Sequence, residues 1–323
     1  MARNGLWFGV VSPNPDGNTV DTVTVRQLKR GEDKLWRECS RGQWPPQGPE
    51  FTNDLGFRPE AHLIAERMGQ VVGRIESVLN EPYSAVLTDP IVRDNENVEA
   101  IARLLISEAL RMARSTSAAQ IELVLESHLP YLERILALAG EFEFDRAFEK
   151  ALYTCDMALL SPLSSAESLD YRSVAETGSS VAIATIGQIL KAPLNRYEIG
   201  VDAESMFGEL AEGCRKGAGF HPEDWLIGYR DDHPVGIVMP ALTDLATHRA
   251  TILFVGITPD ARGRGLGFAL TLKGLETIAR RSPSGFIDST DVQNGPMRRV
   301  LERIGYRLVA IQHYLRWRGP EGR

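Results

Sequence analysis

The stretch Phe254-Val255-Gly256-Ile257-Thr258-Pro259-Asp260-Ala261-Arg262-Gly263-Arg264-Gly265-Leu266-Gly267 decides the fold that we expect. It joins an apolar segment, typical of a buried strand (Ala250–Ile257), to an amphipathic segment typical of a helix, which ends near Arg281. Glycine has no Cβ, so the backbone of this loop can approach a ligand closely. The first N–H groups of a helix lack intrahelical partners and lie at the positive end of its dipole. The stretch therefore predicts a phosphate-binding loop.

The spacing of Arg262, Gly265 and Gly267 resembles the acetyl-CoA signature of the GNAT superfamily of N-acetyltransferases, Arg/Gln-x-x-Gly-x-Gly/Ala. The strand before the loop, its Thr-Pro-Asp lead-in and the helix after it match the family as well. The resemblance implies acetyl-CoA as the acyl donor. Its pyrophosphate would be held by the backbone amides of Arg262, Gly263, Arg264, Gly265, Leu266 and Gly267, with added charge from Arg264 or the nearby Lys273. The alternative is a strand–helix turn that binds nothing.

The same resemblance assigns roles to two further segments. The backbone of Val255, Gly256 and Ile257 would pair with the pantetheine arm, and the N–H of Val255 or Gly256 would polarise the thioester carbonyl. Asn294 begins the run Asn294-Gly295-Pro296-Met297, which resembles a second family signature that contacts the CoA arm. An Asn before Gly-Pro is an equally good helix cap without any ligand.

The acid and the base that many family members carry are absent from their usual places. Leu301 stands where the family's acidic Tyr is expected, and Thr251 stands where some members have a basic Glu. Asp291, at the end of a predicted strand beside Asn294, is our candidate for steering the amine or relaying its proton, although a turn-capping role would explain it too. His248 is a second candidate because histidine ordinarily titrates near neutral pH. It lies in a polar stretch where an exposed histidine is the simpler interpretation.

Two halves of the chain repeat the same order of features. Gly73 recurs as Gly236, Ile91 as Ile257 and Gly140 as Gly305, at separations of 163 to 166 residues. We therefore predict an α/β fold of two tandem GNAT folds, each a mixed, mostly antiparallel sheet flanked by helices. The predicted parts are a first domain (1–160), a linker (161–180) and a second domain (181–323). Mycothiol synthase and a tandem protein of the clavulanic acid pathway have a similar two-domain plan.

Several element predictions bear on this plan. Residues 142–159 are predicted to form two strands that close the first sheet, 181–186 to begin the second sheet as a strand, and 306–317 to close that sheet. In the repeat register, Glu96, Glu99 and Ile101 replace Arg262, Gly265 and Gly267 of the loop. Two carboxylates would repel a pyrophosphate. The first domain is therefore expected to be degenerate, and to wall the substrate site or hold a homodimer.

Composition limits the other classes of function. The net charge of −7 and the pI of about 5.5 argue against nucleic acid or an anionic membrane as partners. Cys39, Cys155 and Cys214 are too far apart for metal-ligand spacing, so we expect reduced thiols, no metal and a cytoplasmic location. No apolar stretch approaches the length that spans a membrane.

These observations predict an N-acetyltransferase that moves an acetyl group from acetyl-CoA to the amine of a small molecule, by direct attack, in the C-terminal domain. The alternatives are a non-catalytic acyl-CoA-binding or regulatory protein, an acetyltransferase acting on a protein amine, and the use of another acyl-CoA. A Rossmann-type nucleotide enzyme fits less well, because its glycine loop follows the first strand of its unit and this loop follows the fourth.

Overall fold

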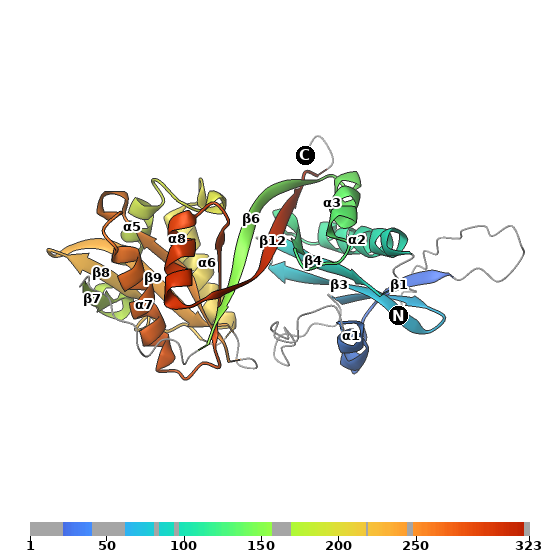
Figure 1. The fold of residues 1–323 in the computed structure, drawn as a ribbon, viewed down its shortest axis with the longest axis horizontal. Coiled ribbons are helices and arrows are strands. Elements are labelled where there is room, and N and C mark those ends of the chain that lie inside the picture. The colour runs from blue at the N-terminus through green and yellow to red at the C-terminus, as the bar shows by residue number, and fades with distance from the viewer. Residues whose placement is uncertain are drawn as a thin grey trace, which may run out of the picture. The chain divides into compact units, whose positions relative to one another are not determined.

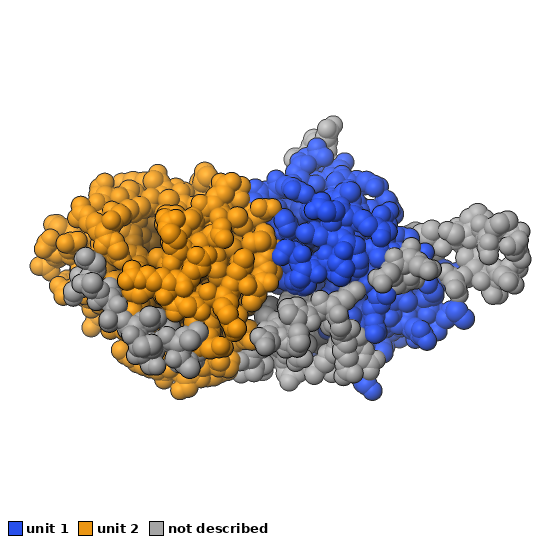
Figure 2. Space-filling view, viewed as in Figure 1, with its two compact units in different colours: residues 1–48, 57–148, 312–323 blue, residues 49–56, 149–311 orange. Residues whose placement is uncertain are grey.

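The computed structural model describes residues 22–40, 62–80, 84–93, 97–156, 169–217, 219–243 and 248–319. These residues form two compact units (Figures 1 and 2). Unit 1 contains the described residues up to 148 together with 312–319, and unit 2 contains the described residues from 149 to 311. No helix of the described residues is long and apolar enough to cross a membrane.

Unit 1 is a mixed sheet with helices packed against it. Its elements are β1 (Val23–Gln27), α1 (Asp33–Ser40), β2 (His62–Arg67), β3 (Gln70–Asn80), β4 (Ser84–Val92), α2 (Val98–Arg114), β5 (Gln120–Glu126), α3 (Leu132–Glu141) and the beginning of β6 (Phe144–Cys155). Strands β1 to β4 are antiparallel neighbours in chain order, and β4 pairs with β5 in parallel. The buried residues of α2 recur at helical spacing and join the largest apolar cluster of this unit.

Unit 2 repeats this order. Its elements are β7 (Asp170–Ser173), α4 (Val174–Thr177), α5 (Ser179–Ile189), η3 (Arg196–Glu198), α6 (Ala203–Lys216), β8 (Leu226–Arg230), β9 (His233–Leu242), β10 (Ala250–Ile257), η4 (Pro259–Ala261), α7 (Leu266–Ala279), β11 (Phe286–Asp291), α8 (Gly295–Ile304) and the beginning of β12 (Arg307–Trp317). Strands β7 to β10 are antiparallel neighbours, and β11 runs parallel to β10. One apolar cluster lies under α5 and α6, and another lies under α7 and α8.

Each unit takes its closing strand from the other half of the chain. In unit 2, β11 pairs antiparallel with residues 150–155 of β6, which follow the first repeat. In unit 1, β5 pairs antiparallel with residues 312–316 of β12, which follow the second repeat. The prediction that residues 306–317 close the second sheet and 142–159 the first was therefore wrong about the partners. Residues 142–159 also supply one described strand rather than two.

The repeat is visible in matching local geometry. In unit 1, Gly73 faces Val92 in the β3–β4 pair, and in unit 2 Gly236 faces Ile257 in the β9–β10 pair. A Cβ on Gly236 would come within 2.6 Å of the carbonyl oxygen of Gly256, so this position requires glycine, and a Cβ on Gly73 would make a tight contact of 3.0 Å with a backbone oxygen. The structural counterpart of Ile257 is thus Val92, one residue from the Ile91 that the sequence register suggested.

One sequence prediction for the beginning of unit 2 was wrong. The apolar run 181–186 is not a strand but part of α5, whose buried residues Ala182, Thr185, Ile186 and Ile189 follow helical spacing. The expected linker, 161–180, contains β7 and α4 over residues 170–177, and its residues 161–168 lie outside the described residues. A capping box at Ser173, reciprocated by Glu176, begins α4, so the Ser- and Glu-rich composition reflects a helix start there.

Candidate functional site

The glycine loop of unit 2 leads into α7 through two left-handed residues. Gly263 has a φ of 79°, and Gly265, the N-cap of α7, has a φ of 75°. Side-chain-bearing residues avoid this region, so the loop conformation needs glycine at both positions. No side chain caps the helix. The N–H groups of its first turn, Leu266 and Gly267, therefore meet the requirements of an anion site.

The surroundings of Gly267 leave room that the protein itself does not fill. Within the part of the chain that the structure describes, a Cβ at this position would meet only Cγ1 of Ile257, at 4.0 Å, and a Cβ at Gly263 would meet nothing within 4 Å. Packing within the chain thus does not explain why residue 267 is glycine. Close approach of a ligand to the helix start does explain it.

The guanidinium of Arg262 is hydrogen-bonded to backbone carbonyl oxygens of unit 2. Its Nε donates to the carbonyl oxygen of Ile257 at 3.0 Å, and its terminal nitrogens donate to the carbonyl oxygens of Ala192 at 2.7 Å and Ile189 at 3.5 Å. These carbonyls belong to the end of β10 and to the end of α5 and the turn after it. Arg262 thus fixes the loop to two elements, and Arg264, which is exposed, remains as the loop cation.

Strand β10 separates from β11 almost as soon as it begins. The two strands share one parallel pair, Ala250 with Phe286, whereas β10 pairs with β9 along its whole length. The side chain of Asp288 lies where the strands part. Its Oδ1 accepts hydrogen bonds from the backbone N–H of Ile252 at 2.6 Å and from the hydroxyl of Thr251 at 3.1 Å. Among the described residues, no strand pairs with the β11-facing edge of β10 beyond this point, which includes Val255, Gly256 and Ile257.

Asp288 is a buried carboxyl with an unusual titration. Its Oδ2 accepts a hydrogen bond from the hydroxyl of Tyr306. Burial raises its pKa to about 7, against the hydrogen bonds from Tyr306, Ile252 and Thr251, which favour the charged form. The carboxyl group beside Thr251 is thus supplied by Asp288 of the neighbouring strand, β11. The sequence placed Asp288 on β11 but gave no reason to prefer it to Asp291.

A polar cluster joins the 195–198 segment to the end of β11 and the start of α8. Asn294 caps α8, accepting the N–H of Met297 at 3.1 Å, and its Nδ2 donates to Oδ1 of Asn195 at 2.8 Å. Asn195 in turn donates to Oε1 of Glu198 at 2.7 Å. Glu198 is 7% exposed, and its burial raises its pKa, although the Asn195 bond and the charges of Lys150 and Arg262 act the other way.

Asp291 is held in an ion pair with Arg196. Its carboxylate is fully buried and accepts from the backbone N–H of Arg196 at 3.0 Å, from two nitrogens of the Arg196 guanidinium at 2.9 and 3.2 Å, and from the N–H of Gln293 at 2.8 Å. Burial alone would raise its pKa, but the hydrogen bonds from Arg196 and Gln293 outweigh burial and the pKa is lowered. These contacts suit an anchor for the 195–198 segment better than a proton acceptor.

His248 and Lys273 lie apart from this cluster. His248 precedes β10, and its Nε2 lies 3.1 Å from the carbonyl oxygen of Arg281. Since β10 rises about 3.3 Å per residue, His248 is at the opposite end of the strand from the glycine loop. Lys273, on α7, pairs with Glu276 at 3.8 Å.

The structure thus brings together the end of β10, the glycine loop, Asn294 and Asp291, and adds Asn195, Glu198 and Asp288. Asn195 and Glu198 were missed because they belong to no local motif, and Asn195, which bonds Glu198, precedes its partner Asn294 by 99 residues. The one sequence signal was the mainly polar run Leu194-Asn195-Arg196-Tyr197-Glu198, which comes shortly after the apolar run 181–186.

The equivalent place in unit 1 is filled by its own side chains. The hydroxyl of Tyr131 bonds both the N–H and the carbonyl oxygen of Val92, the counterpart of Ile257. Asp89 accepts the N–H of Glu126 at 2.8 Å and so bridges β4 and β5 where their pairing ends. Five residues separate β4 from α2, whereas eight separate β10 from α7. Glu99 lies within the first turn of α2, paired with Arg134 at 2.8 Å, and Glu96 lies outside the described residues.

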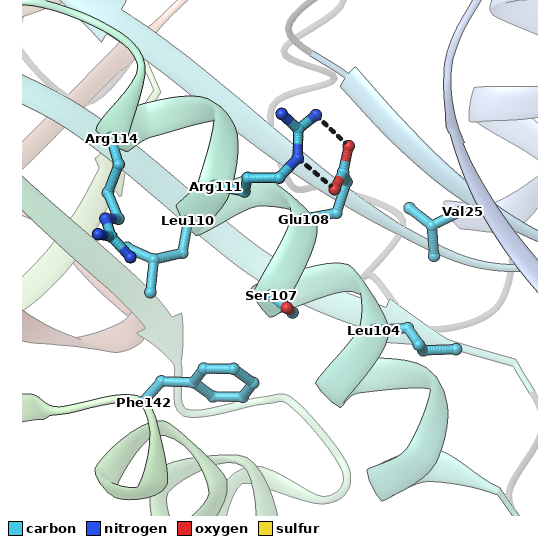
Figure 3. A pocket seen from close by; sticks show the side chains of 8 residues that line it. All are labelled: Val25, Leu104, Ser107, Glu108, Leu110, Arg111, Arg114 and Phe142. Atoms are coloured by element: carbon cyan, nitrogen blue, oxygen red, sulfur yellow. Dashed lines mark hydrogen bonds and ion pairs between the residues drawn. The ribbon is translucent and has the colours of Figure 1, made fainter. Parts of the chain in front are cut away.

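A cavity of about 420 Å³ lies in unit 1, away from the glycine loop. The residues that line it come mainly from α2, with Val25 and Phe142 opposite (Figure 3). Its charged side chains include Glu108 and Arg111, which bond each other at 2.6 and 2.7 Å. This hollow offers neither exposed helix-start amides nor the glycines of the loop, so it is not where the phosphate-binding features converge.

Comparisons with known proteins match the region of the chain that contains this candidate site. The acetyltransferase (GNAT) family matches residues 194–306, which include the loop, β10, β11 and the 195–198 segment. Mycothiol acetyltransferase of Thermobifida fusca is 30% identical over 110 residues, which are 33% of this chain and 30% of that protein. The chain therefore spans less than a third of the curated relative that it matches.

Two solved structures share the fold over nearly the whole chain. A GCN5-related N-acetyltransferase from Sphaerobacter thermophilus has a TM-score of 0.63 at 14% identity, covering 91% of this chain and 95% of that one. The tandem GNAT protein from the clavulanic acid biosynthesis pathway has a TM-score of 0.59 at 16% identity, covering 93% and 100%. Residues 194–306 therefore match the acetyltransferase (GNAT) family, and the fold of nearly the whole chain is similar to that of the tandem GNAT protein.

Proposed function

We propose that unit 2 transfers an acetyl group from acetyl-CoA to the amine of a small molecule. The observation that carries the proposal is the combination of an uncapped helix start behind two left-handed glycines with a strand, β10, whose edge separates from β11. The backbone N–H groups from Gly263 to Gly267 bind the pyrophosphate, assisted by Arg264. The free edge of β10 at Val255, Gly256 and Ile257 holds the pantetheine arm.

The reaction is a direct attack of the amine on the thioester carbonyl. The C–N bond forms, the C–S bond breaks, and the CoA thiolate leaves with the electron pair. A backbone N–H of Val255 or Gly256 stabilises the developing oxyanion. Glu198 accepts the proton of the amine, since burial raises its pKa above the ordinary value and so makes its carboxylate a better proton acceptor. Asp291 is a positioning residue, because its pair with Arg196 holds the segment that carries Glu198.

The cofactor site is tested by Gly267→Asp. The fold has room for this side chain, and an acidic residue in a first helical turn favours the helix. The added carboxylate would, however, face the pyrophosphate. Calorimetric titration with acetyl-CoA should give one site per chain in the wild type and at least about a 100-fold weaker affinity in the variant, because like charges repel at close range. Gly208→Asp, on an open face of α6, is the matched control and should bind as the wild type does.

The base is tested by Glu198→Gln. Release of the CoA thiol is followed with a panel of small amines and of peptides. Glu198→Gln should lower kcat by about 100-fold or more, leave the affinity for acetyl-CoA unchanged and remove the rising limb of the pH–rate profile. Acetylation confined to peptides would replace the small-molecule acceptor by a protein amine. An unchanged pH profile would eliminate Glu198.

A second candidate is an acyl-CoA-binding protein without turnover. Leu301 and Thr251 favour it, because they replace the acid and the base that many relatives carry at those places. Tight acetyl-CoA binding with no thiol release on any amine would support this reading and would leave the binding site itself intact.

A further inference from the structure

A histidine and two carboxylates meet in unit 1, where β4 and β5 stop pairing. Ligand atoms of Asp89, Glu126 and His128 all lie within 4.8 Å of one another. Asp89 belongs to β4, Glu126 is the last residue of β5, and His128 follows two residues later. We propose that these three side chains bind a divalent transition metal ion such as Zn²⁺. The site would be separate from the acetyl-transfer site in unit 2 and independent of it.

Each acid has one oxygen engaged by the protein. Oδ1 of Asp89 accepts the backbone N–H of Glu126 at 2.8 Å, and Oε1 of Glu126 accepts Nε2 of Gln312 at 2.9 Å. Glu126 is only 7% exposed, and its buried Oε2 receives no hydrogen bond from the described residues. A buried carboxylate oxygen without a donor is costly, and a cation bound to it would offset that cost.

The separation between the ligand atoms of Glu126 and His128 suits one shared ion. Oε2 of Glu126 lies 3.3 Å from Nδ1 of His128. Two ligands held about 2.1 Å from a tetrahedral Zn²⁺ lie roughly 3.4 Å apart. Imidazole nitrogen and carboxylate oxygen are both ligands of zinc. The His128 side chain is 23% exposed, which gives the ion a route in from solvent and leaves space for a water molecule as a fourth ligand.

The charges of the cluster favour the same occupant. Asp89 and Glu126 are two carboxylates whose ligand oxygens lie within 4.8 Å of each other, and Glu126 is buried. The two acids therefore repel each other when both are ionised, and a divalent cation relieves that repulsion. The competing occupant is a proton shared between the acids, and the experiment below separates the two.

The test is a titration of the untagged full chain with ZnCl₂ after treatment with a chelator. We expect one equivalent bound. His128→Ala and Glu126→Gln should each weaken the affinity by at least about 100-fold, and Gln312→Leu, which removes only a hydrogen bond to a ligand, by about 10-fold. His221→Ala is the matched control. Nδ1 of His221 also lies 3.2 Å from a glutamate oxygen, that of Glu223, but the pair is exposed and belongs to no such cluster.

Co²⁺ gives a second readout. Its absorption spectrum should show the bands of a nitrogen and oxygen site without thiolate charge transfer, since Cys39 is not a ligand of the proposed site. Circular dichroism of each variant checks that it folds. If a ligand variant does not fold, the loss of zinc affinity in Gln312→Leu still tests the proposal. The absence of zinc binding in the wild type would overturn the proposal in favour of a shared proton. So would binding that survives His128→Ala and Glu126→Gln, or binding that only His221→Ala removes.

Discussion

In unit 1 the hydroxyl of Tyr131 donates to the carbonyl oxygen of Val92 at 2.8 Å and accepts a hydrogen bond from the N–H of the same residue. One buried side chain thus satisfies both backbone groups at the end of β4. At the equivalent end of β10, Nε of Arg262 donates a hydrogen bond to the carbonyl oxygen of Ile257. The two repeats thus differ at the point where their sheets part. In unit 1 a tyrosine hydroxyl binds both backbone groups of the last strand residue, and in unit 2 an arginine of the loop binds only its carbonyl oxygen.

Tyr131→Phe should destabilise unit 1 without creating an acyl-CoA site. Two buried backbone groups would lose their partner, which costs about 1–3 kcal/mol in the free energy of unfolding. Urea unfolding, with hydrogen exchange at residues 90–93 as the local probe, measures the loss. Calorimetry should still give one acetyl-CoA site per chain. A second site in the variant would contradict the view that the first repeat has lost its loop as well as its strand edge.

Arg262→Lys should loosen the glycine loop while keeping its charge. Lysine cannot reproduce the fork of donors that reaches Ile257, Ala192 and Ile189. We expect a loss of about 1–3 kcal/mol, faster hydrogen exchange at residues 189–193 and 258–265, and weaker acetyl-CoA binding. Arg264→Lys, with the same change of side chain at an exposed position, should alter the affinity but not the exchange rates. Equal effects on exchange would show that Arg262 does not brace the loop.

Asp288 should make the stability of unit 2 fall as the pH rises. Its folded pKa, about 7, lies above the ordinary value of 3.8, so the folded state holds a proton that the unfolded state has released between these values. The stabilisation is complete below about pH 4 and is lost as the pH passes through 7. Asp288→Asn, which keeps a neutral side chain, should remove about 2–4 kcal/mol of this pH dependence.

The measurement compares urea unfolding at pH 5 and pH 8 for the wild type and for Asp288→Asn. Asp89 in unit 1 has a pKa raised to about 7 as well, so Asp89→Asn is the control that removes the same kind of titration from the other unit. Local exchange at residues 250–253 assigns the effect to unit 2. An identical slope in the wild type and Asp288→Asn would show that Asp288 is ionised throughout this range.

Asp291→Asn should free the 195–198 segment. The substitution removes the negative charge that pairs with Arg196 and holds its guanidinium and backbone N–H. Loss of charged hydrogen bonds to a fully buried group costs about 1.5–3 kcal/mol. Since the folded pKa is lowered, the stabilisation is present above the ordinary value and disappears only as the pH falls below it. Faster exchange at residues 195–199 at pH 7, with a difference from the wild type that shrinks as the pH falls below 3.8, would confirm the assignment.

The glycine loop could be predicted because its signal is local. The positions that need a positive φ, the apolar strand before them and the helix after them all lie within one short stretch, and each leaves a mark on composition. The cluster of Asn195, Glu198 and Asn294 leaves no such mark, because folding brings its members together from opposite ends of unit 2. Asp288 was indistinguishable from its neighbours, since burial rather than sequence position raises its pKa.

Strand pairing shows the same limit. Alternation identifies β12 as a strand but says nothing of which edge receives it, because antiparallel edges accept any strand of suitable pattern. The error at α5 has a different cause. Residues 181–186 are a short apolar run that fits either element, and only Ile189, beyond that window, completes the helical spacing.

The exchange of closing strands also determines when each sheet can be completed during translation. Residues 312–316 complete the sheet of unit 1, yet they leave the ribosome after every residue of unit 2 that the structure describes. Until then β5 carries an unpaired edge, with backbone groups open to any passing strand. The nascent chain must therefore keep its first-made domain unfinished while the second is translated. A strand supplied by a neighbouring copy could occupy that edge first and link two chains into a swapped dimer.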